Sequence, residues 1–192
     1  MTNSVKNILL AGVGGQGTLL ASEVLSEALM LAGHDVKKSE IHGMSQRGGS
    51  VTSHVRFGPK VLSPLIPEGE ADILFGFELL ETYRNLPSLR AGGDVVANDL
   101  KVIPATVSMG VSAYPEDIPA KIEAAVPGAK IVNGMELARE AGNLKTANVA
   151  LLGTLSRSLE LEEETWVEAL NKLVPAKFLE VNLKAFTLGR SV

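Results

Sequence analysis

The chain has 192 residues, enough for one domain with a buried core, and its 45% apolar and 21% charged residues are the balance of an ordinary globular protein. Its formal net charge of −4 and the lack of a long basic run exclude the clustered positive surface that is typical of nucleic-acid-binding proteins. The sequence contains no cysteine, which excludes disulfide bonds, thiolate-bound zinc and cysteine-ligated iron–sulfur clusters within this chain.

The N-terminal segment lacks the pattern of a signal peptide, because only the short run from Ile8 to Gly14 is free of charged and amide side chains. No apolar stretch approaches the roughly eighteen residues that a membrane span requires. We therefore expect a cytoplasmic protein without membrane contact.

The hydrophobic pattern predicts strands that alternate with helices along most of the chain. The first predicted strand begins at residue 5 and runs into a glycine turn that ends at residue 17; the other strands are 35–41, 51–57, 61–66, 73–77, 94–98 and 130–132. The predicted helices are 18–32, 78–86, one that has Asp117 as its N-cap and ends near Pro127, 133–141, 145–159, 162–174 and one that begins at 176. Asn133 and Glu136 have the spacing of a capping box at the start of the helix 133–141.

This order of elements predicts an α/β fold: a single, three-layer, Rossmann-like domain that spans residues 1–192 and has a mostly parallel sheet and a helical C-terminal segment. In the strand 51–57, Val51, Ser53, Val55 and Phe57 face one way, and the residues between them give the strand a polar face. This strand and its predicted neighbour 61–66 are candidates for an antiparallel part of the sheet.

The first candidate site is the glycine turn, which follows a strand and opens a helix and matches G-x-G-x-x-G at Gly12, Gly14 and Gly17. Such a turn can present backbone N–H groups and a positive helix end to a phosphate, or it can merely allow close packing of the strand on the helix. Both interpretations remain open. A dinucleotide site also requires an acid near the end of the second strand, for which Asp35 and Glu40 are candidates.

The second candidate site is the loop 42–50, which gathers imidazole, hydroxyl, amide and guanidinium groups among glycines. Arg47 suits bidentate capture of a carboxylate or a phosphate. In a parallel sheet this loop lies at the same carboxyl edge as the glycine turn, where ligands bind at switch points. We therefore expect a ligand site or a subunit interface formed by Gly12, Gly14, Gly15, Gln16, Gly17, His42, Ser45, Gln46, Arg47, Gly48, Gly49 and Ser50.

The residues do not indicate a metal site, a hydrolase nucleophile or a P-loop. His42 and His54 could approach each other, but no carboxylate cluster completes a metal site, and a structural role on the polar strand face is favoured for His54. The sequence has neither a G-x-S-x-G nucleophile elbow nor a P-loop lysine motif. We assign no catalytic residue and no metal ligand.

Four blocks together resemble the gamma-type subunits of 2-oxoacid:ferredoxin oxidoreductases, and within them the beta subunits of indolepyruvate oxidoreductases. The blocks are AGVGGQG at 11–17 with the helix that follows, EIHGMSQRGGSVTSHVRFG at 40–58, SPLIPEGEADILFGFE at 63–78 and NLKTANVALLGTLS at 143–156. The resemblance covers essentially the whole chain, and HGMSQRGG is its most specific part.

The resemblance implies an accessory subunit that is inactive alone. A large partner subunit would carry thiamine diphosphate, magnesium and 4Fe–4S clusters, and the complex would convert an arylpyruvate and coenzyme A into an aryl-acetyl-CoA and carbon dioxide while reducing ferredoxin. Contact of this chain with coenzyme A is a further possibility. The sequence agrees, since it lacks cysteine and since Gly92-Gly93-Asp94 is followed by Val95 and does not match the family's thiamine diphosphate motif. Two alternatives are a small nucleotide-binding dehydrogenase and a regulatory binding module without such a partner.

Overall fold

The computed structural model describes residues 4–43 and 49–192. Its strands are β1 (Lys6–Val13), β2 (Asp35–His42), β3 (Ser50–Gly58), β4 (Ala71–Gly76), β5 (Leu89–Asn98) and β6 (Lys130–Val132). Its helices are α1 (Thr18–Leu31), α2 (Leu79–Asn85), α3 (Ala105–Ser108), α4 (Ile118–Ala125), α5 (Gly134–Ala141), α6 (Ala147–Ser156), α7 (Glu163–Leu173) and α8 (Ala176–Arg190), with short 3-10 helices at Leu86–Ser88 and Leu144–Thr146.

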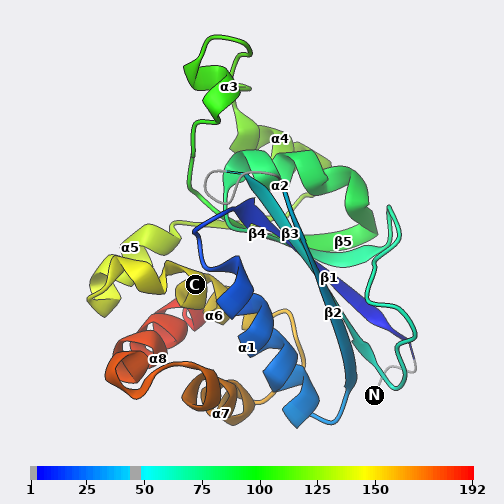
Figure 1. Ribbon diagram of the computed structural model, residues 1–192, viewed down its shortest axis with the longest axis vertical. Helices are drawn as coiled ribbons and strands as arrows, with labels where there is room; N and C mark the ends of the chain where they lie inside the picture. Colours follow the sequence, from blue (N-terminus) through cyan, green and yellow to red (C-terminus); the bar gives the residue numbers. More distant parts are fainter. Residues whose placement is uncertain (1–3, 44–48) are drawn as a thin grey trace.

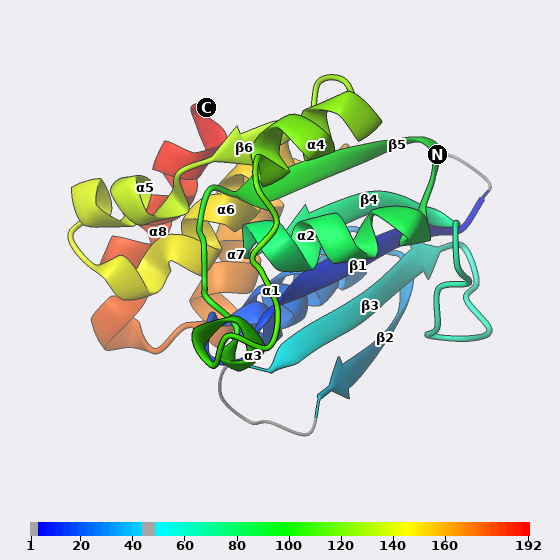
Figure 2. The same cartoon turned by 90° about the horizontal axis from the view of Figure 1, so that it is seen from above.

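Within the described ranges, the strands form one sheet in the order β2-β3-β1-β4-β5-β6, which can be followed in Figure 2. Strand β1 pairs in parallel with β4, and β5 pairs in parallel with both β4 and β6. Strand β3 runs antiparallel to both of its neighbours, β1 and β2. The predicted α/β fold with a mixed, mostly parallel sheet is therefore confirmed, and the antiparallel part lies between β1 and β2.

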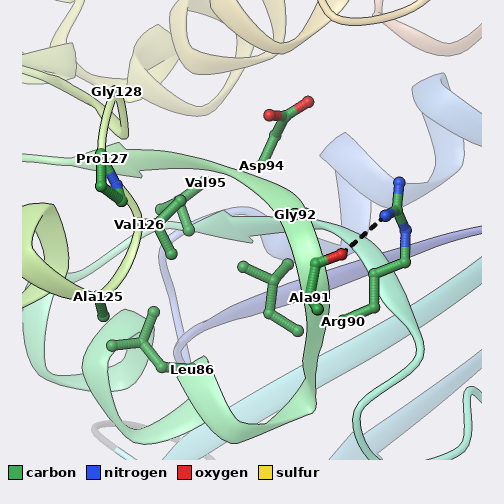
Figure 3. A pocket seen from close by; sticks show the side chains of 12 residues that line it. Leu86, Arg90, Ala91, Gly92, Asp94, Val95, Ala125, Val126, Pro127 and Gly128 are labelled. Carbon is green, nitrogen blue, oxygen red and sulfur yellow. Dashed lines mark hydrogen bonds between the residues drawn. The ribbon is translucent and has the colours of Figure 1, made fainter.

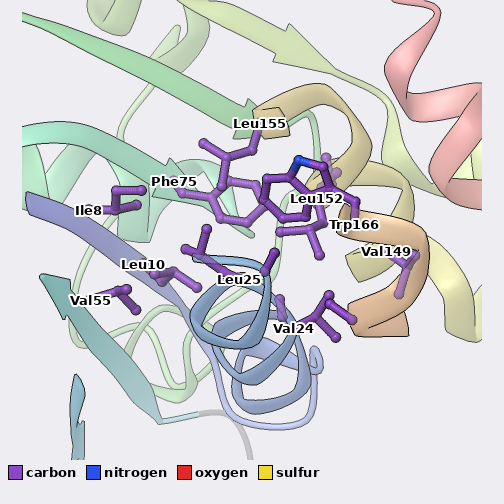
Figure 4. Packing of buried hydrophobic residues seen from close by; sticks show 14 of the residues in the cluster. Ile8, Leu10, Val24, Leu25, Val55, Phe75, Val149, Leu152, Leu155 and Trp166 are labelled. Carbon is purple, nitrogen blue, oxygen red and sulfur yellow. The ribbon is translucent and has the colours of Figure 1, made fainter. Parts of the chain in front are cut away.

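Helices cover both faces of the sheet and give the three predicted layers (Figure 1). Alternate residues of β1 point to opposite faces, as strand geometry requires. Ile8 and Leu10 pack with α1, α6 and α7, whereas Leu9 packs with α2 and α4. Figure 4 shows the larger cluster, in which Trp166 of α7 lies fully buried beside Leu152 and Leu155. A buried tryptophan removes about 200 Å² of surface from water, so this contact fixes the C-terminal helices against the sheet.

The C-terminal helices agree with the sequence-based prediction in number and place. Helices α6 and α8 cross so closely that a β-carbon on Gly189 would lie 1.7 Å from the carbonyl oxygen of Ala150. A β-carbon on Gly153 would lie 2.1 Å from the carbonyl oxygen of Phe186. The two glycines therefore permit contact between the two helix backbones.

Two local predictions need correction. The segment 61–66 is not a strand but an irregular loop, whose backbone is held by side chains: Val61 N–H donates to Asp35 at 2.8 Å and Ile66 N–H donates to His54 Nδ1 at 3.1 Å. Asp117 precedes α4 as predicted, but its side chain makes no capping hydrogen bond because its backbone is left-handed, with φ of 52°. Asn133 does cap α5, accepting a hydrogen bond from Glu136 N–H at 3.1 Å. In the described part of the chain, no helix combines the length and apolar character needed to cross a bilayer.

A candidate site at the carboxyl edge of the sheet

The candidate site lies where the direction of strand connection changes. From β1 the chain passes through α1 to β2 on one side of the sheet, whereas from β4 it passes through α2 to β5 on the other side. The carboxyl ends of β1 and β4 therefore border a switch point, the usual place for a ligand in an open α/β sheet. We call this region the switch-point site; its described residues are Gly12–Gly17, His42–Gly43, Gly49–Ser50 and Phe77–Glu81.

The glycine turn is closed by its own glutamine. The side-chain oxygen of Gln16 accepts from Val13 N–H at 2.7 Å, and its amide nitrogen donates to the carbonyl oxygen of Phe77 at 3.2 Å. The Gln16 N–H itself donates to the carbonyl oxygen of Val13 at 3.2 Å. Because these N–H groups already have acceptors, they are not available to phosphate oxygens.

Two of the glycines permit close packing at this turn. A β-carbon on Gly12 would lie 2.9 Å from the Phe77 β-carbon, and one on Gly17 would lie 2.6 Å from Asn148 Nδ2. Gly17 also has φ of 78°, a left-handed conformation that suits glycine. The Asn148 amide donates to the carbonyl oxygen of Gly17 at 3.1 Å, so α6 is joined directly to the start of α1. These contacts support the packing interpretation of the motif.

The two candidate loops meet, as the sequence predicted. Gly14 N–H donates to the carbonyl oxygen of Gly49 at 2.9 Å, and the Ser50 hydroxyl donates to Glu81 at 2.6 Å. His42 is exposed at the end of β2, with Nε2 at 3.4 Å from a Glu40 carboxylate oxygen. The structure thus places the glycine turn, His42, Gly49 and Ser50 at one edge. Ser45, Gln46, Arg47 and Gly48 lie outside the described residues.

The switch-point site also contains two buried carboxylates, those of Glu78 and Glu81 at the start of α2, to which sequence reasoning gave no role. Glu78 is only 1% exposed; one carboxylate oxygen accepts from Glu81 N–H at 2.8 Å and so caps α2. The other oxygen accepts from Val102 N–H at 3.0 Å and from the Tyr114 hydroxyl at 3.3 Å. Burial and the neighbouring Glu78 carboxylate raise the pKa of Tyr114 to about 12. The available signal was a glutamate at the first position of a predicted helix, directly after a predicted strand, but its partners Val102 and Tyr114 are distant in sequence.

The acid that a dinucleotide would need is not suitably placed. Asp35 pairs with Gly58 at the opposite, amino edge of the sheet and binds Lys37 at 2.6 Å. Glu40 lies nearer the carboxyl edge, but β3 separates β2 from β1, which puts β2 about 10 Å from β1 across the sheet. In dinucleotide-binding folds these two strands are neighbours. The geometry therefore disfavours a nicotinamide dinucleotide site.

His54 has structural surroundings. His54 accepts the hydrogen bond from Ile66 N–H, and burial lowers the pKa of His54, as suits a neutral acceptor. Among residues 4–43 and 49–192, no group of three or more histidine and acidic side chains is arranged to hold a metal ion.

Comparison with known proteins decides the family. The family described as pyruvate ferredoxin/flavodoxin oxidoreductase matches residues 7–192. The chain belongs to this family. It is 44% identical over 188 residues to the indolepyruvate oxidoreductase subunit IorB of Thermococcus kodakarensis, a match that covers 95% of this chain and 93% of the relative. It is 35% identical to the subunit of the same name from Methanothermobacter thermautotrophicus, with 95% of each chain covered.

Two solved structures have the same fold as this chain. The gamma subunit of a keto/oxoacid ferredoxin oxidoreductase from Geobacter sulfurreducens matches with a TM-score of 0.71 and 23% identity over 97% of this chain and 96% of that one. A 2-oxoglutarate:ferredoxin oxidoreductase chain from Magnetococcus marinus, solved with 2-oxoglutarate, coenzyme A and succinyl-CoA, matches with a TM-score of 0.72 and 21% identity. That match covers 97% of this chain but 30% of the longer one. The predicted type, a subunit of an oxoacid:ferredoxin oxidoreductase, is confirmed.

Proposed function

We propose that this chain is the accessory subunit of an indolepyruvate:ferredoxin oxidoreductase. The single observation that carries the proposal is the 44% identity, over nearly the full length of both chains, to a protein named as a subunit of indolepyruvate oxidoreductase. The reaction of the complex is the conversion of an arylpyruvate and coenzyme A into an aryl-acetyl-CoA and carbon dioxide. Two electrons leave the substrate and reduce two ferredoxins.

The residues of this chain favour a non-catalytic role. Iron–sulfur clusters are generally held by cysteine thiolates, and the chain has no cysteine. The Gly92-Gly93-Asp94 segment lies at the start of β5, at the amino edge, where it lines a cavity of about 430 Å³ with Arg90 (Figure 3). It is thus remote from the switch-point site. We therefore assign thiamine diphosphate, magnesium and the 4Fe–4S clusters to a large partner subunit, where they would supply decarboxylation and electron transfer.

Reconstitution tests the proposal. The isolated chain, the large thiamine diphosphate and iron–sulfur subunit, and their mixture are each assayed for viologen reduction with indolepyruvate and coenzyme A. We expect no reduction by the isolated chain and full activity only in the mixture, with 2-oxoglutarate as the control substrate that lacks an aromatic ring. Dye reduction by the isolated chain, or a large subunit indifferent to its addition, would contradict the proposal. An absence of any large partner on co-purification would favour a regulatory binding module.

We further propose that the switch-point site receives an anionic group in the complex, either a phosphate of coenzyme A or a carboxylate of the large subunit. The hydrogen bond from Gly14 N–H to the carbonyl oxygen of Gly49 supports this, because Gly49 follows Arg47 by two residues in the sequence. Loss of a charge-assisted hydrogen bond of roughly 1.5–3 kcal/mol in Arg47→Ala should weaken coenzyme A use or subunit association about ten- to a hundredfold.

The matched control for Arg47→Ala is Lys60→Ala, which removes an exposed positive charge at the opposite edge of the sheet. The measurements are the apparent KM for coenzyme A and the dissociation constant of the subunits. Wild-type values for Arg47→Ala in both would show that the loop is only a solvated surface.

A further inference from the structure

A second cavity lies at the amino edge of the sheet, remote from the switch-point site. Its volume is about 360 Å³. Small-molecule sites generally measure roughly 300–1,000 Å³. The cavity is bordered by the first halves of β1, β4 and β5, by the end of α1 and by residues 158–161 of the loop from α6 to α7. Segments from most of the length of the chain thus meet at a cavity that the proposed function does not use.

The floor of this cavity is apolar. Ile8 of β1 pairs in register with Ile73 of β4, and Ile73 pairs with Asp94 of β5, so the three residues form a row across the sheet. Ile8 and Ile73 belong to the buried cluster that packs against α1. Two strand spacings, about 10 Å, separate Ile8 from Asp94. The row therefore offers a buried apolar surface that ends at a carboxylate.

The two cations that line the cavity already share a carboxylate. Asp72 Oδ1 lies 2.8 Å from Arg90 Nε and 3.5 Å from Lys6 Nζ, and the other oxygen of Asp72 accepts from Asn7 N–H at 2.8 Å. The Arg90 guanidinium also donates to the carbonyl oxygen of Ala91 at 3.0 Å, as Figure 3 shows. These partners reduce the attraction of Lys6 and Arg90 for an added anion.

Two further carboxylates line the cavity without a cation of their own. Asp94 and Glu160 are exposed, and neither forms an ion pair with any residue that the structure describes. Figure 3 shows the Asp94 side chain on the opposite side of β5 from Val95. Because Val96 lies in the cluster against α1, strand alternation places Asp94 on the same face as Ile73. The cavity therefore has an excess of negative charge beside its apolar floor.

These features favour an organic ammonium over a metal ion. In the described part of the chain, no three histidine and acidic side chains are grouped to hold a metal. A metal ion would also leave the apolar floor without a partner. An ammonium with an apolar body uses both features, because its N–H groups donate to the carboxylates while its body covers Ile8 and Ile73.

Two aromatic rings at the cavity favour an aromatic body. His34 and Phe57 both line the cavity, with ring centroids 5.2 Å apart and ring planes at 70°. Edge-to-face pairs of this kind are favourable beyond the area that they bury, and a third ring can extend them. A rigid ring also loses little conformational entropy when it binds.

We infer that this cavity binds a small molecule in which a primary ammonium is attached to an aromatic ring system, as in an aromatic amine or an aromatic amino acid. The ammonium lies at Asp94 and Glu160, and the ring lies on Ile8 and Ile73. The inference does not depend on the proposed function, since binding requires neither a partner subunit nor turnover.

The test is calorimetric titration of the full chain with four probes. Tryptamine should bind with a dissociation constant below about 1 mM. Indole-3-acetate has the same ring without the ammonium, and n-butylamine has the ammonium without the ring; each should bind at least about tenfold more weakly. L-Tryptophan distinguishes the two sources of the shared chemistry: affinity equal to or above that of tryptamine identifies an amino acid, and lower affinity identifies an amine.

The variant Asp94→Asn/Glu160→Gln removes both carboxylates and keeps the shape of the side chains. It should weaken tryptamine binding at least about tenfold. The matched control is Asp99→Asn/Glu140→Gln, which changes the net charge equally at exposed residues outside the cavity. The control should bind like wild type, and the melting temperatures of all three chains should agree. Ala32→Phe, which fills the cavity, should also reduce the affinity.

Three results would overturn the inference. The first is the absence of measurable binding of both tryptamine and L-tryptophan at millimolar concentrations. The second is binding of indole-3-acetate as tight as that of tryptamine, which would show that the ammonium is not recognised. The third is equal affinity for tryptamine in Asp94→Asn/Glu160→Gln and in its control, which would place the bound amine elsewhere on the chain.

Discussion

The contact between Gly17 and Asn148 predicts a specific energetic coupling across the fold. In Gly17→Ala the new β-carbon would lie 2.6 Å from Asn148 Nδ2, and the backbone would keep φ of 78°. A left-handed conformation costs a non-glycine residue about 1–2 kcal/mol, and overpacking adds about 1–3 kcal/mol. We expect Gly17→Ala to lower the free energy of unfolding by about 2–5 kcal/mol, measured by urea unfolding of the isolated chain.

A double-mutant cycle separates the two contributions. In an Asn148→Ala background the amide that opposes the new β-carbon is gone, so Gly17→Ala should cost only the conformational strain of about 1–2 kcal/mol. The coupling free energy between the two substitutions is then about 1–3 kcal/mol. The carbonyl oxygen of Gly17 keeps the N–H of Ala21 as a donor at 3.1 Å, so Asn148→Ala leaves no buried acceptor without a partner there.

Gly15→Ala provides the control cycle. Gly15 has φ of 102°, but a β-carbon there would meet no atom within 4 Å. Its cost should therefore be strain alone, and it should add to that of Asn148→Ala within about 0.5 kcal/mol. If Gly17→Ala has the same cost in both backgrounds, the steric reasoning is refuted and the glycine is needed only for its conformation.

Three further predictions concern other parts of the molecule. Calorimetric titration with NAD or NADP should give a dissociation constant weaker than about 10 μM, because β3 separates Glu40 from the glycine turn; tighter binding would restore the dehydrogenase alternative. Phenolate absorbance should show Tyr114 titrating near pH 12. Because the unfolded chain loses this proton near pH 10, the free energy of unfolding should fall as pH rises from 10 to 12. Tyr114→Phe should abolish that fall, and an equal fall in the variant would contradict the prediction. Gly189→Ala should destabilise the chain by about 3 kcal/mol or more in urea unfolding, because its β-carbon would meet a backbone oxygen of α6; a loss below about 1 kcal/mol would show that α8 can shift.

Most of the elements could be predicted because their signals are local. Alternation of apolar and polar residues marked β3, and the Asn133–Glu136 spacing marked the start of α5. The alternation of side chains along a strand and the capping of a helix each depend only on residues a few positions apart. The segment 61–66 was misassigned because an apolar run bounded by turn residues can be either a strand or a loop. Here side chains of Asp35 and His54, both distant in sequence, hold its N–H groups.

The position of the candidate site also followed from the sequence. The glycine turn and the loop that begins at His42 each come after a strand that runs in the same direction, and the structure joins them through Gly14 and Gly49. The role of Arg47 in that site stays a prediction. The buried Glu78 in the site could not be predicted, because its partners Val102 and Tyr114 lie more than twenty residues away in the sequence. The carbonyl oxygen of Phe77 likewise accepts hydrogen bonds from two side-chain amides that are distant in sequence. One is Gln16, which follows β1, and the other is Asn98, at the end of β5.

By itself the sequence determined most of the elements and their order, the lack of thiolate ligands in this chain and the two loops that border the site. Only the tertiary structure decided that β3 lies between β1 and β2, that Asn148 joins α6 to the start of α1 and that Glu78 accepts from Val102 N–H and the Tyr114 hydroxyl. The physical reason is that a strand has hydrogen-bonding groups on two sides and a buried polar group needs only a partner of suitable geometry. Neither requirement specifies which distant residue supplies the partner, and that choice is made when the layers pack.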